Sequence, residues 1–186
     1  MVKTKERLST ESWLMAGFRA LARSGPQALK AEPLARELGT TKGSFYWHFK
    51  DVASFQSQML ELWETRAVDD ITRYLDHEAD PVRKLYMLGE ISTSSNPDHG
   101  GDAVEPAIRA WAQSNHTAAY VVERVDQKRL EYLHGILTEL DLSNPDFARL
   151  IYGAYIGMGT LSAKDGNDNK DAMSTLLAAL LALRDA

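Results

Sequence analysis

The stretch that decides the fold of this chain spans residues 34–51 and reads LARELGTTKGSFYWHFKD. It predicts two short helices joined by a tight turn. Apolar residues share one face of the first segment, and Gly39 follows where a helix end favours a residue that tolerates positive φ. Thr40 or Thr41 can cap a second helix, over residues 42–48, by accepting a backbone N–H. The pattern is typical of a helix-turn-helix.

The second helix has a surface suited to a DNA major groove. Phe45 and Phe49 are available for a core, but the three residues between them cannot all face one core on a helix. Small residues at its start let the backbone come close, and the aromatic residues offer a thymine methyl an apolar face and a phosphate a polar tip. The residues predicted to contact DNA are Thr40, Thr41, Lys42, Gly43, Ser44, Tyr46, Trp47, His48 and Lys50.

These residues divide into two predicted roles. Base contacts are expected from Lys42, Ser44 and Tyr46. The other side chains are expected to fix the DNA backbone, which positions a protein without reading the sequence. They are Thr40, Thr41, Trp47, His48 and Lys50.

The run TTKGSFYWHFKD, residues 40–51, resembles the recognition-helix signature of the tetracycline-repressor-like (TetR/AcrR) family of bacterial regulators. The resemblance implies an all-α protein of about nine to ten helices. It implies an N-terminal three-helix head that binds DNA, residues 1–50, and a helical body for effector binding and dimerisation, residues 51–186. Two positions depart from the family pattern. Lys30 stands where a Thr or Ser usually caps the second helix, which should cost about 1 kcal/mol, and Val52 stands where a phosphate-binding Lys often follows.

The composition is ordinary for a globular protein with a core, at 44% hydrophobic and 25% charged residues. The absence of cysteine excludes a disulfide framework, a thiol nucleophile and a cysteine-based metal site. The longest apolar run, near residues 176–183, is far shorter than the ~20 residues that a membrane span needs. Charged residues at Glu6, Glu11 and Arg19 interrupt any signal-peptide pattern. We therefore expect a cytoplasmic protein.

The distribution of charge matters more than the net charge of −5. Residues 1–50 hold nine Lys and Arg against four Asp and Glu, a net charge of +5, whereas residues 51–186 hold twelve against twenty-two, a net charge of −10. Basic charge is thus concentrated around the predicted recognition helix, which favours binding to a polyanion through that end of the chain.

One helix precedes the decisive stretch and a long one follows it. A stripe at Leu14, Phe18 and Leu21 predicts the first helix. The second, which is the first helix of the stretch, begins near Lys30 or Ala31. Asp51 should cap a long fourth helix, which continues to about Leu75. That helix would join the head to the body and transmit a tilt from one to the other. Residues 1–8 are equally compatible with a phosphate-binding arm and a solvated tail.

The clearest loop of the body is residues 94–102, SSNPDHGGD. Asp98, His99 and Asp102 suggest a metal site, but three candidate ligands on a Gly/Pro loop without supporting groups are weak evidence. We therefore predict a solvated turn, with no metal and no cofactor.

The later apolar stripes predict helices near residues 105–115, 117–140, 146–162 and 171–184. Three glycines inside the third of these each cost about 1 kcal/mol against alanine, so a close helix–helix contact or a ligand must justify them. The resemblance to the family implies that 117–140 and 146–162 pair with their copies as a four-helix dimer interface. The alternative is an ordinary core within one chain.

These observations predict a homodimeric transcriptional regulator, most simply a repressor that a small-molecule effector releases from a palindromic operator. The large side chains that could line an effector pocket serve equally well in core packing. They are Trp63, Met87, Ile91, Trp111, Tyr120 and Tyr152.

Two alternatives stay open. One is a DNA-binding regulator of the same fold that senses no small molecule. The remote one is a helical metal-dependent enzyme using His99, His116 or His134, although nothing pairs these residues with acids at catalytic spacing. No catalytic residue is therefore predicted.

Overall fold

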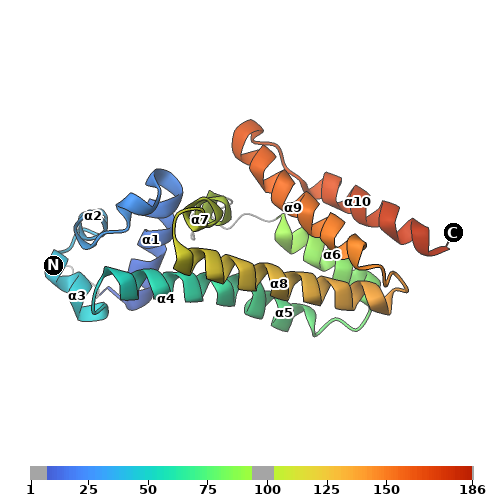
Figure 1. Cartoon of the computed structure of the whole chain (residues 1–186), viewed down its shortest axis with the longest axis horizontal. Coiled ribbons are helices and arrows are strands. Elements are labelled where there is room, and N and C mark those ends of the chain that lie inside the picture. Colours follow the sequence, from blue (N-terminus) through green and yellow to red (C-terminus); the bar gives the residue numbers. More distant parts are fainter. Residues whose placement is uncertain (1–7, 94–102, 186) are drawn as a thin grey trace, which may run out of the picture. The chain divides into compact units, whose positions relative to one another are not determined.

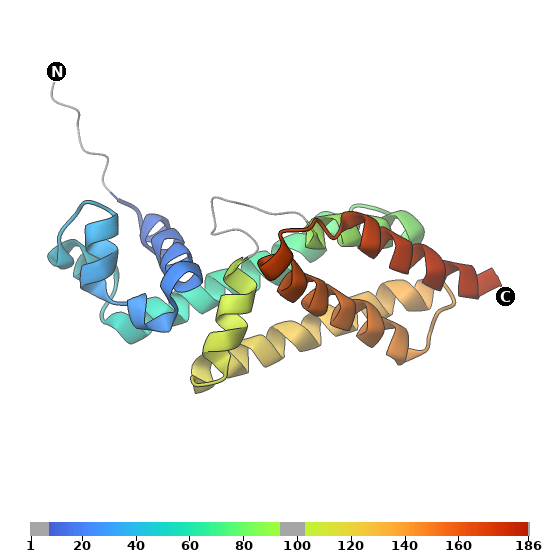
Figure 2. The ribbon, with the colours of Figure 1, turned by 90° about the horizontal axis from the view of Figure 1, so that it is seen from above.

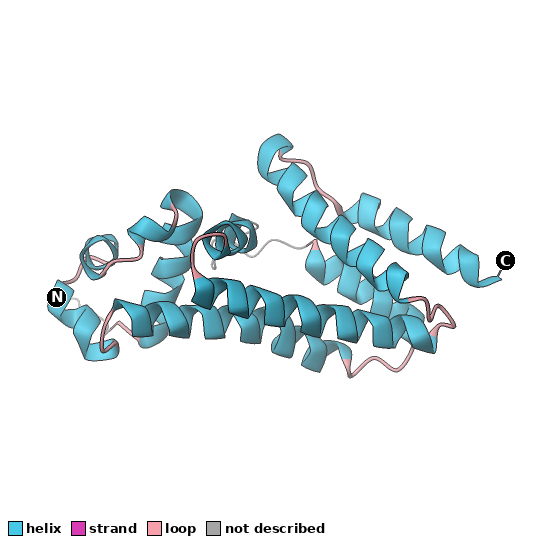
Figure 3. Ribbon diagram, in the orientation of Figure 1, coloured by secondary structure: helices cyan, strands magenta, loops and turns pink. Residues whose placement is uncertain are grey.

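The computed structural model describes residues 8–93 and 103–185, and every regular element in those ranges is helical (Figures 1 and 3). The predicted all-α fold is therefore confirmed. The α-helices are α1 (Thr10–Ser24), α2 (Ala31–Glu37), α3 (Lys42–His48), α4 (Val52–Glu64), α5 (Asp70–Leu75), α6 (Pro81–Ser92), α7 (Val104–Ala112), α8 (His116–Glu139), α9 (Pro145–Asp165) and α10 (Lys170–Ala182).

The chain forms two compact units. Two of the boundaries between them in the sequence fall within α4 and within α8. The first unit comprises Met1–Leu62 and Asn96–Ala119, and the second comprises Trp63–Ser95 and Tyr120–Ala186. The predicted functional division at residue 50 is a different boundary and stays a prediction.

Aromatic side chains form the core of the first unit. Trp13 of α1 meets Phe45 of α3 edge to face, with ring centroids 5.4 Å apart. Phe49 and Phe55 lie 5.0 and 5.3 Å from Phe45, and all four side chains are at most 1% exposed. The burial predicted for Phe45 and Phe49 is thus confirmed. Such aromatic pairs contribute about 0.5–1.5 kcal/mol each beyond the apolar area that they bury.

Helices α1 and α4 approach closely because α1 carries a glycine at the contact. A Cβ on Gly17 would lie 2.6 Å from Cζ of Phe55 and 2.7 Å from Sδ of Met59. Ion pairs join α1 to α2, where Glu37 accepts from Arg19 at 3.2 Å and from Arg23 at 2.8 Å. Helix α7 also packs against α1 in this unit.

The local signals that the sequence offered for the head correspond to observed turns and caps. Gly39 has φ +59° in the turn between α2 and α3. Thr41 caps α3, and Asp51 caps α4 by accepting from the Ser54 N–H at 2.7 Å. Lys30 occupies the N-cap position of α2 and makes no side-chain cap, as the departure from the family pattern predicted.

The long fourth helix predicted from Asp51 to Leu75 is interrupted by a turn of different geometry. Residues Thr65–Asp69 form a π turn between α4 and α5, with no Gly or Pro to signal it. The sequence did not predict this turn. Single π turns of this kind are rare and often lie at functional sites.

In the second unit, α6, α8, α9 and α10 surround an apolar core, and α9 and α10 run side by side (Figures 1 and 2). A Cβ on Gly89 of α6 would lie 2.9 Å from Cδ1 of Leu177 of α10, so these two helices pack closely. The core residues are Leu85, Leu133, Ile136, Leu137, Leu140, Leu142, Ala148, Ile151, Tyr152, Met173, Leu177 and Leu180.

The predicted solvated turn at residues 94–102, with Asp98, His99 and Asp102, lies outside the described residues. Within residues 8–93 and 103–185, no cluster of three His, Asp or Glu side chains is placed to hold a metal ion. In the same ranges, no helix is long and apolar enough to cross a membrane.

Candidate DNA-binding surface

Helix α3 is held in the head by one buried side and by both of its ends. Phe45 is fully buried and anchors the middle of the helix. At the first turn, Oγ1 of Thr41 accepts from the Ser44 N–H at 3.3 Å, and at the last turn the Phe49 N–H donates to the Phe45 carbonyl at 3.0 Å. Because Phe45 fixes the buried side, the residues on the other side face water.

The predicted contact residues differ in exposure along this helix. Trp47 is 84% exposed and Tyr46 is 47% exposed. An exposed tryptophan gains nothing from the protein's own core, so its large apolar surface is available to a partner. The other residues predicted to contact DNA fall into two groups. Four are exposed, namely Thr41, Lys42, Gly43 and Lys50, and three are half-buried, namely Thr40, Ser44 and His48.

Gly43 has no packing role within its own chain. A Cβ at this position would meet only Oγ1 of Thr41, at 3.7 Å, which is ordinary contact. A glycine costs about 1 kcal/mol against alanine inside a helix. The packing of the fold therefore does not require a glycine here.

His48 is not a free surface residue. Its Nδ1 lies 3.1 Å from Oγ1 of Thr10, in the first turn of α1. The ring also lies against Trp13, with centroids 6.4 Å apart, and against Phe49, with centroids 6.1 Å apart. The contact with Thr10 has no signal in the sequence, because 38 residues separate Thr10 from His48.

The residues predicted to line an effector pocket have different surroundings in the structure. In the second unit, Trp63 and Tyr152 are buried, Met87 and Ile91 are half-buried, and Tyr120 is 63% exposed. Tyr120 stacks beneath the guanidinium of Arg124, whose Cζ lies 5.2 Å from the ring centroid. The remaining candidate, Trp111, is buried in the first unit.

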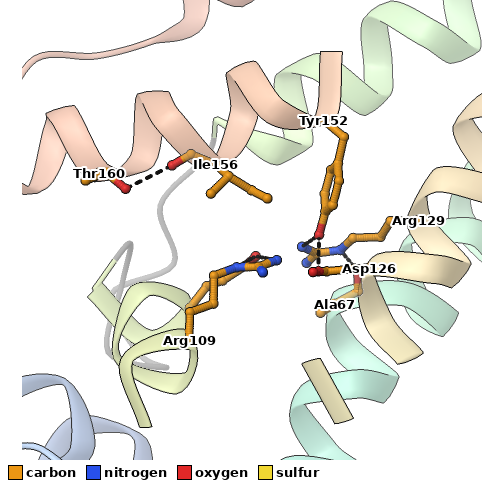
Figure 4. Close-up of polar contacts among 8 residues, drawn as sticks. Ala67, Arg109, Asp126, Arg129, Tyr152, Ile156 and Thr160 are labelled. Atoms are coloured by element: carbon orange, nitrogen blue, oxygen red, sulfur yellow. Dashed lines mark hydrogen bonds and ion pairs between the residues drawn. The ribbon is translucent and has the colours of Figure 1, made fainter. Parts of the chain in front are cut away.

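A polar network inside the second unit was not predicted. Figure 4 shows Tyr152 of α9 pointing toward Asp126 and Arg129 of α8. The Tyr152 hydroxyl donates to Oδ1 of Asp126 at 2.6 Å and accepts from Arg129 at 3.3 Å. Nε of Arg129 also donates to the Ala67 carbonyl within the π turn, at 3.2 Å. One arginine therefore links the π turn to α9.

A second set of contacts from α8 holds both ends of the π turn. Glu64, which is 8% exposed, accepts two hydrogen bonds from Arg124, one of them at 2.7 Å from Nε. Nζ of Lys128 lies 2.9 Å from Glu64 and 3.5 Å from Asp69. The hydrogen bonds from Arg124, reinforced by Lys128, hold the pKa of the Glu64 carboxyl below its ordinary value, although burial opposes the shift. The carboxylate therefore stays ionised at neutral pH.

The geometry of the head defines a class of protein. A short helix that follows a glycine turn, buries one aromatic anchor and exposes basic and aromatic side chains is the reading unit of a helix-turn-helix DNA-binding domain.

The comparisons with known proteins agree with this class. Residues 14–52 match the family model of bacterial regulatory proteins, tetR family. This match confirms the predicted resemblance to the TetR family for the helix-turn-helix head, and the fold of the whole chain is similar to that of a solved TetR-family regulator. That family consists of regulators rather than enzymes.

Solved structures resemble the chain over nearly its whole length. A putative TetR-family transcriptional regulator from Rhodococcus sp. is 18% identical, with a TM-score of 0.71 over 92% of this chain and 95% of the other. A putative transcriptional regulator from Saccharomonospora viridis in complex with choline is also 18% identical, with a TM-score of 0.73 over 92% of this chain and 94% of the other. The regulator FadR from Bacillus subtilis in complex with stearoyl-CoA is 16% identical, with a TM-score of 0.72 over 93% of this chain and 98% of the other.

At these identities the similarity shows the fold. No curated protein matches the chain.

Proposed function

We propose that the chain is a homodimeric repressor whose α3 helices read the two halves of a palindromic operator and which a small molecule releases from DNA. The observation that supports DNA reading is the exposed side of α3. Trp47, Tyr46 and Lys42 are exposed to solvent there, while Phe45 is buried on the opposite side and anchors the helix. Lys42, Ser44 and Tyr46 are proposed to contact bases, and the other side chains to contact the backbone. These others are Thr40, Thr41, Trp47, His48 and Lys50, with Gly43 allowing the close approach.

A dimer is proposed from one face of α9. Leu150 and Leu161 are 58% and 60% exposed, and Gly153 and Gly157, also exposed, lie between them. The spacing of three, seven and eleven residues places all four on one side of a helix. A Cβ on either glycine would meet nothing within 4 Å, so the chain's own packing does not explain the helix-interior glycines. A second copy of the same face would explain both the glycines and the exposed leucines.

Helix α8 contributes to the same proposal. Gly135 is exposed in α8, and a Cβ there would also meet nothing within 4 Å. We therefore place the dimer interface on α8 and α9, near residues 117–140 and 146–162. A two-fold axis between copies requires half-sites that repeat as a palindrome.

Selection of duplexes from a random-sequence DNA library by the wild-type protein tests the reading function. We expect a palindromic site, bound with an affinity that falls steeply as salt rises, because phosphate contacts release counterions. Enrichment of a non-palindromic site would contradict two-fold reading. Absence of any enriched sequence would contradict the proposed function itself.

Gly157→Glu tests the dimer. The new side chain has room in the single chain and raises helix propensity, so the fold should be kept. In the proposed interface it buries an unpaired charge, which costs several kcal/mol and should raise the Kd of the dimer more than about 100-fold. Sedimentation velocity at micromolar concentration should show wild-type dimer and variant monomer. Ala178→Glu, on the exposed side of α10, is the matched control.

Unchanged dimerisation of the Gly157→Glu variant would place the interface elsewhere. Equal loss of the dimer in the Ala178→Glu control would show that added negative charge, rather than this face, is responsible.

Small-molecule sensing is the third part of the proposal. The similar structures from S. viridis and B. subtilis were determined with choline and with stearoyl-CoA. The effector would favour a body conformation in which the two α3 helices no longer match the operator. The alternative is a regulator of this fold that senses no small molecule. A screen that begins with choline and long-chain acyl-CoA distinguishes these alternatives. Release of the selected duplex by a small molecule supports sensing, and no release supports a regulator that senses none.

A further inference from the structure

We propose that Thr10 is a positioning residue for DNA binding, which acts by fixing the ring of His48 so that Nε2 donates to a phosphate. The inference rests on the proposed DNA-reading function. It concerns a residue of α1 that the recognition-helix pattern does not include.

The ring of His48 is fixed from three sides. Oγ1 of Thr10 lies 3.1 Å from Nδ1. The planes of Trp13 and Phe49 are tilted at 48° and 46° to the imidazole. The two aromatic contacts restrain the position of the ring, but only the hydroxyl distinguishes one ring nitrogen from the other.

This hydrogen bond decides which nitrogen remains for DNA. A phosphate oxygen only accepts, so a histidine that contacts it must present an N–H. When the Thr10 hydroxyl donates to Nδ1, the neutral ring carries its proton on Nε2. When the ring is protonated, Thr10 accepts from Nδ1 and Nε2 again carries a proton. Both states that keep Nε2–H therefore satisfy Thr10. The neutral tautomer with its proton on Nδ1 satisfies Thr10 too, because the hydroxyl then accepts. Thr10 therefore fixes the orientation of the ring, and the phosphate selects the proton on Nε2.

Without the hydroxyl, the orientation of the ring is no longer fixed. In the tautomer that a phosphate requires, with the proton on Nε2, Nδ1 then lacks the donor that Thr10 supplied. The ring can also turn over, since Trp13 and Phe49 offer apolar faces that do not discriminate nitrogen from carbon. Each change weakens a phosphate contact without altering the fold.

The Thr10 hydroxyl is not needed to begin α1. Ser9 is the N-cap, and its Oγ accepts from the Ser12 N–H at 3.1 Å. Thr10→Val keeps the branched shape and should leave the helix start intact. Thr10→Ser keeps the hydroxyl and serves as the conservative control. His48→Phe keeps a ring against Trp13 and removes both nitrogens.

The experiment measures the Kd of these variants, singly and combined, for the duplex that the wild-type protein selects, by fluorescence anisotropy over a salt series. One hydrogen bond is involved, so Thr10→Val should weaken binding about five-fold. Thr10→Ser should stay within about two-fold of wild type. In the His48→Phe background, Thr10→Val should have no further effect.

A second readout does not involve DNA. The ¹⁵N spectrum of the free protein should show a hydrogen-bonded Nδ1 of His48 in wild type and in Thr10→Ser. In Thr10→Val the Nδ1 resonance should lose the shift that this hydrogen bond causes. Thermal unfolding of each variant controls for loss of fold.

Two results would overturn the inference. One is that the Thr10→Val variant binds the selected duplex with wild-type affinity. The other is the same loss of affinity from Thr10→Val whether or not His48 is present, which would mean that Thr10 acts by itself. Failure of the proposed function is distinct, because the wild-type protein would then select no duplex at all.

Discussion

Replacing Lys42 and Tyr46 together with alanine is expected to weaken binding to the selected duplex by about 30-fold or more. The two side chains are the proposed base contacts with the greatest reach, and each good base contact contributes about 1–3 kcal/mol of discrimination. The loss should fall on specific binding, so affinity for unrelated duplex DNA should decrease much less. The salt slope should decrease by about 1 if Lys42 also neutralises a phosphate.

The fold should survive this double change. Lys42 is exposed, and Tyr46 is 47% exposed but meets Phe45 edge to face at 5.3 Å. Loss of that ring contact should cost about 0.5–1.5 kcal/mol, which is a small fall in Tm rather than unfolding.

The matched control is Lys164→Ala with Tyr74→Ala, which removes an exposed lysine and a 57% exposed tyrosine from the body. Binding should be unchanged in the control. Equal binding by both double variants and the wild-type protein would mean that α3 does not read the DNA.

Phe45→Ala is expected to destabilise the head by about 3–5 kcal/mol. The side chain is fully buried, and its ring centroid lies between 5.0 and 5.4 Å from those of Trp13, Phe49 and Phe55. Truncation leaves a cavity among rigid rings that cannot collapse to fill it. Chemical denaturation followed by circular dichroism measures the effect.

The control for this change lies two residues away. Trp47 is 84% exposed, so Trp47→Ala removes a larger ring but should change stability by no more than about 0.5 kcal/mol. Similar destabilisation by both changes would mean that α3 does not bury Phe45 in preference to Trp47. DNA binding should be lost in both variants. In Phe45→Ala the cause should be unfolding of the head, and in Trp47→Ala the loss of a contact with DNA.

Much of the head could be predicted from the sequence because its determinants are local. A turn that requires φ > 0 calls for a glycine, and Gly39 supplies it at +59°. A helix start calls for a short oxygen-bearing side chain, and Thr41 and Asp51 supply it. The burial of Phe45 and Phe49 followed from the geometry of a single helix, because only one side of α3 can face the core.

The parts that could not be predicted depend on contacts between distant residues. The π turn has no local signal, and the side chains that bracket it come from about 60 residues further along the chain, as in the pair of Glu64 and Arg124. The hydrogen bond between Thr10 and His48 spans 38 residues. A sequence pattern places each such residue on a helix but does not say which helix it will face.

The uneven burial of the tryptophans gives the protein an intrinsic optical probe. Of the four tryptophans, Trp13, Trp63 and Trp111 are at most 6% exposed, and only Trp47 is exposed to solvent. A collisional quencher such as iodide or acrylamide would therefore reach one emitter in the folded chain, and that emitter lies on α3. Shielding of this quenchable fraction would report occupancy of the helix without any attached dye.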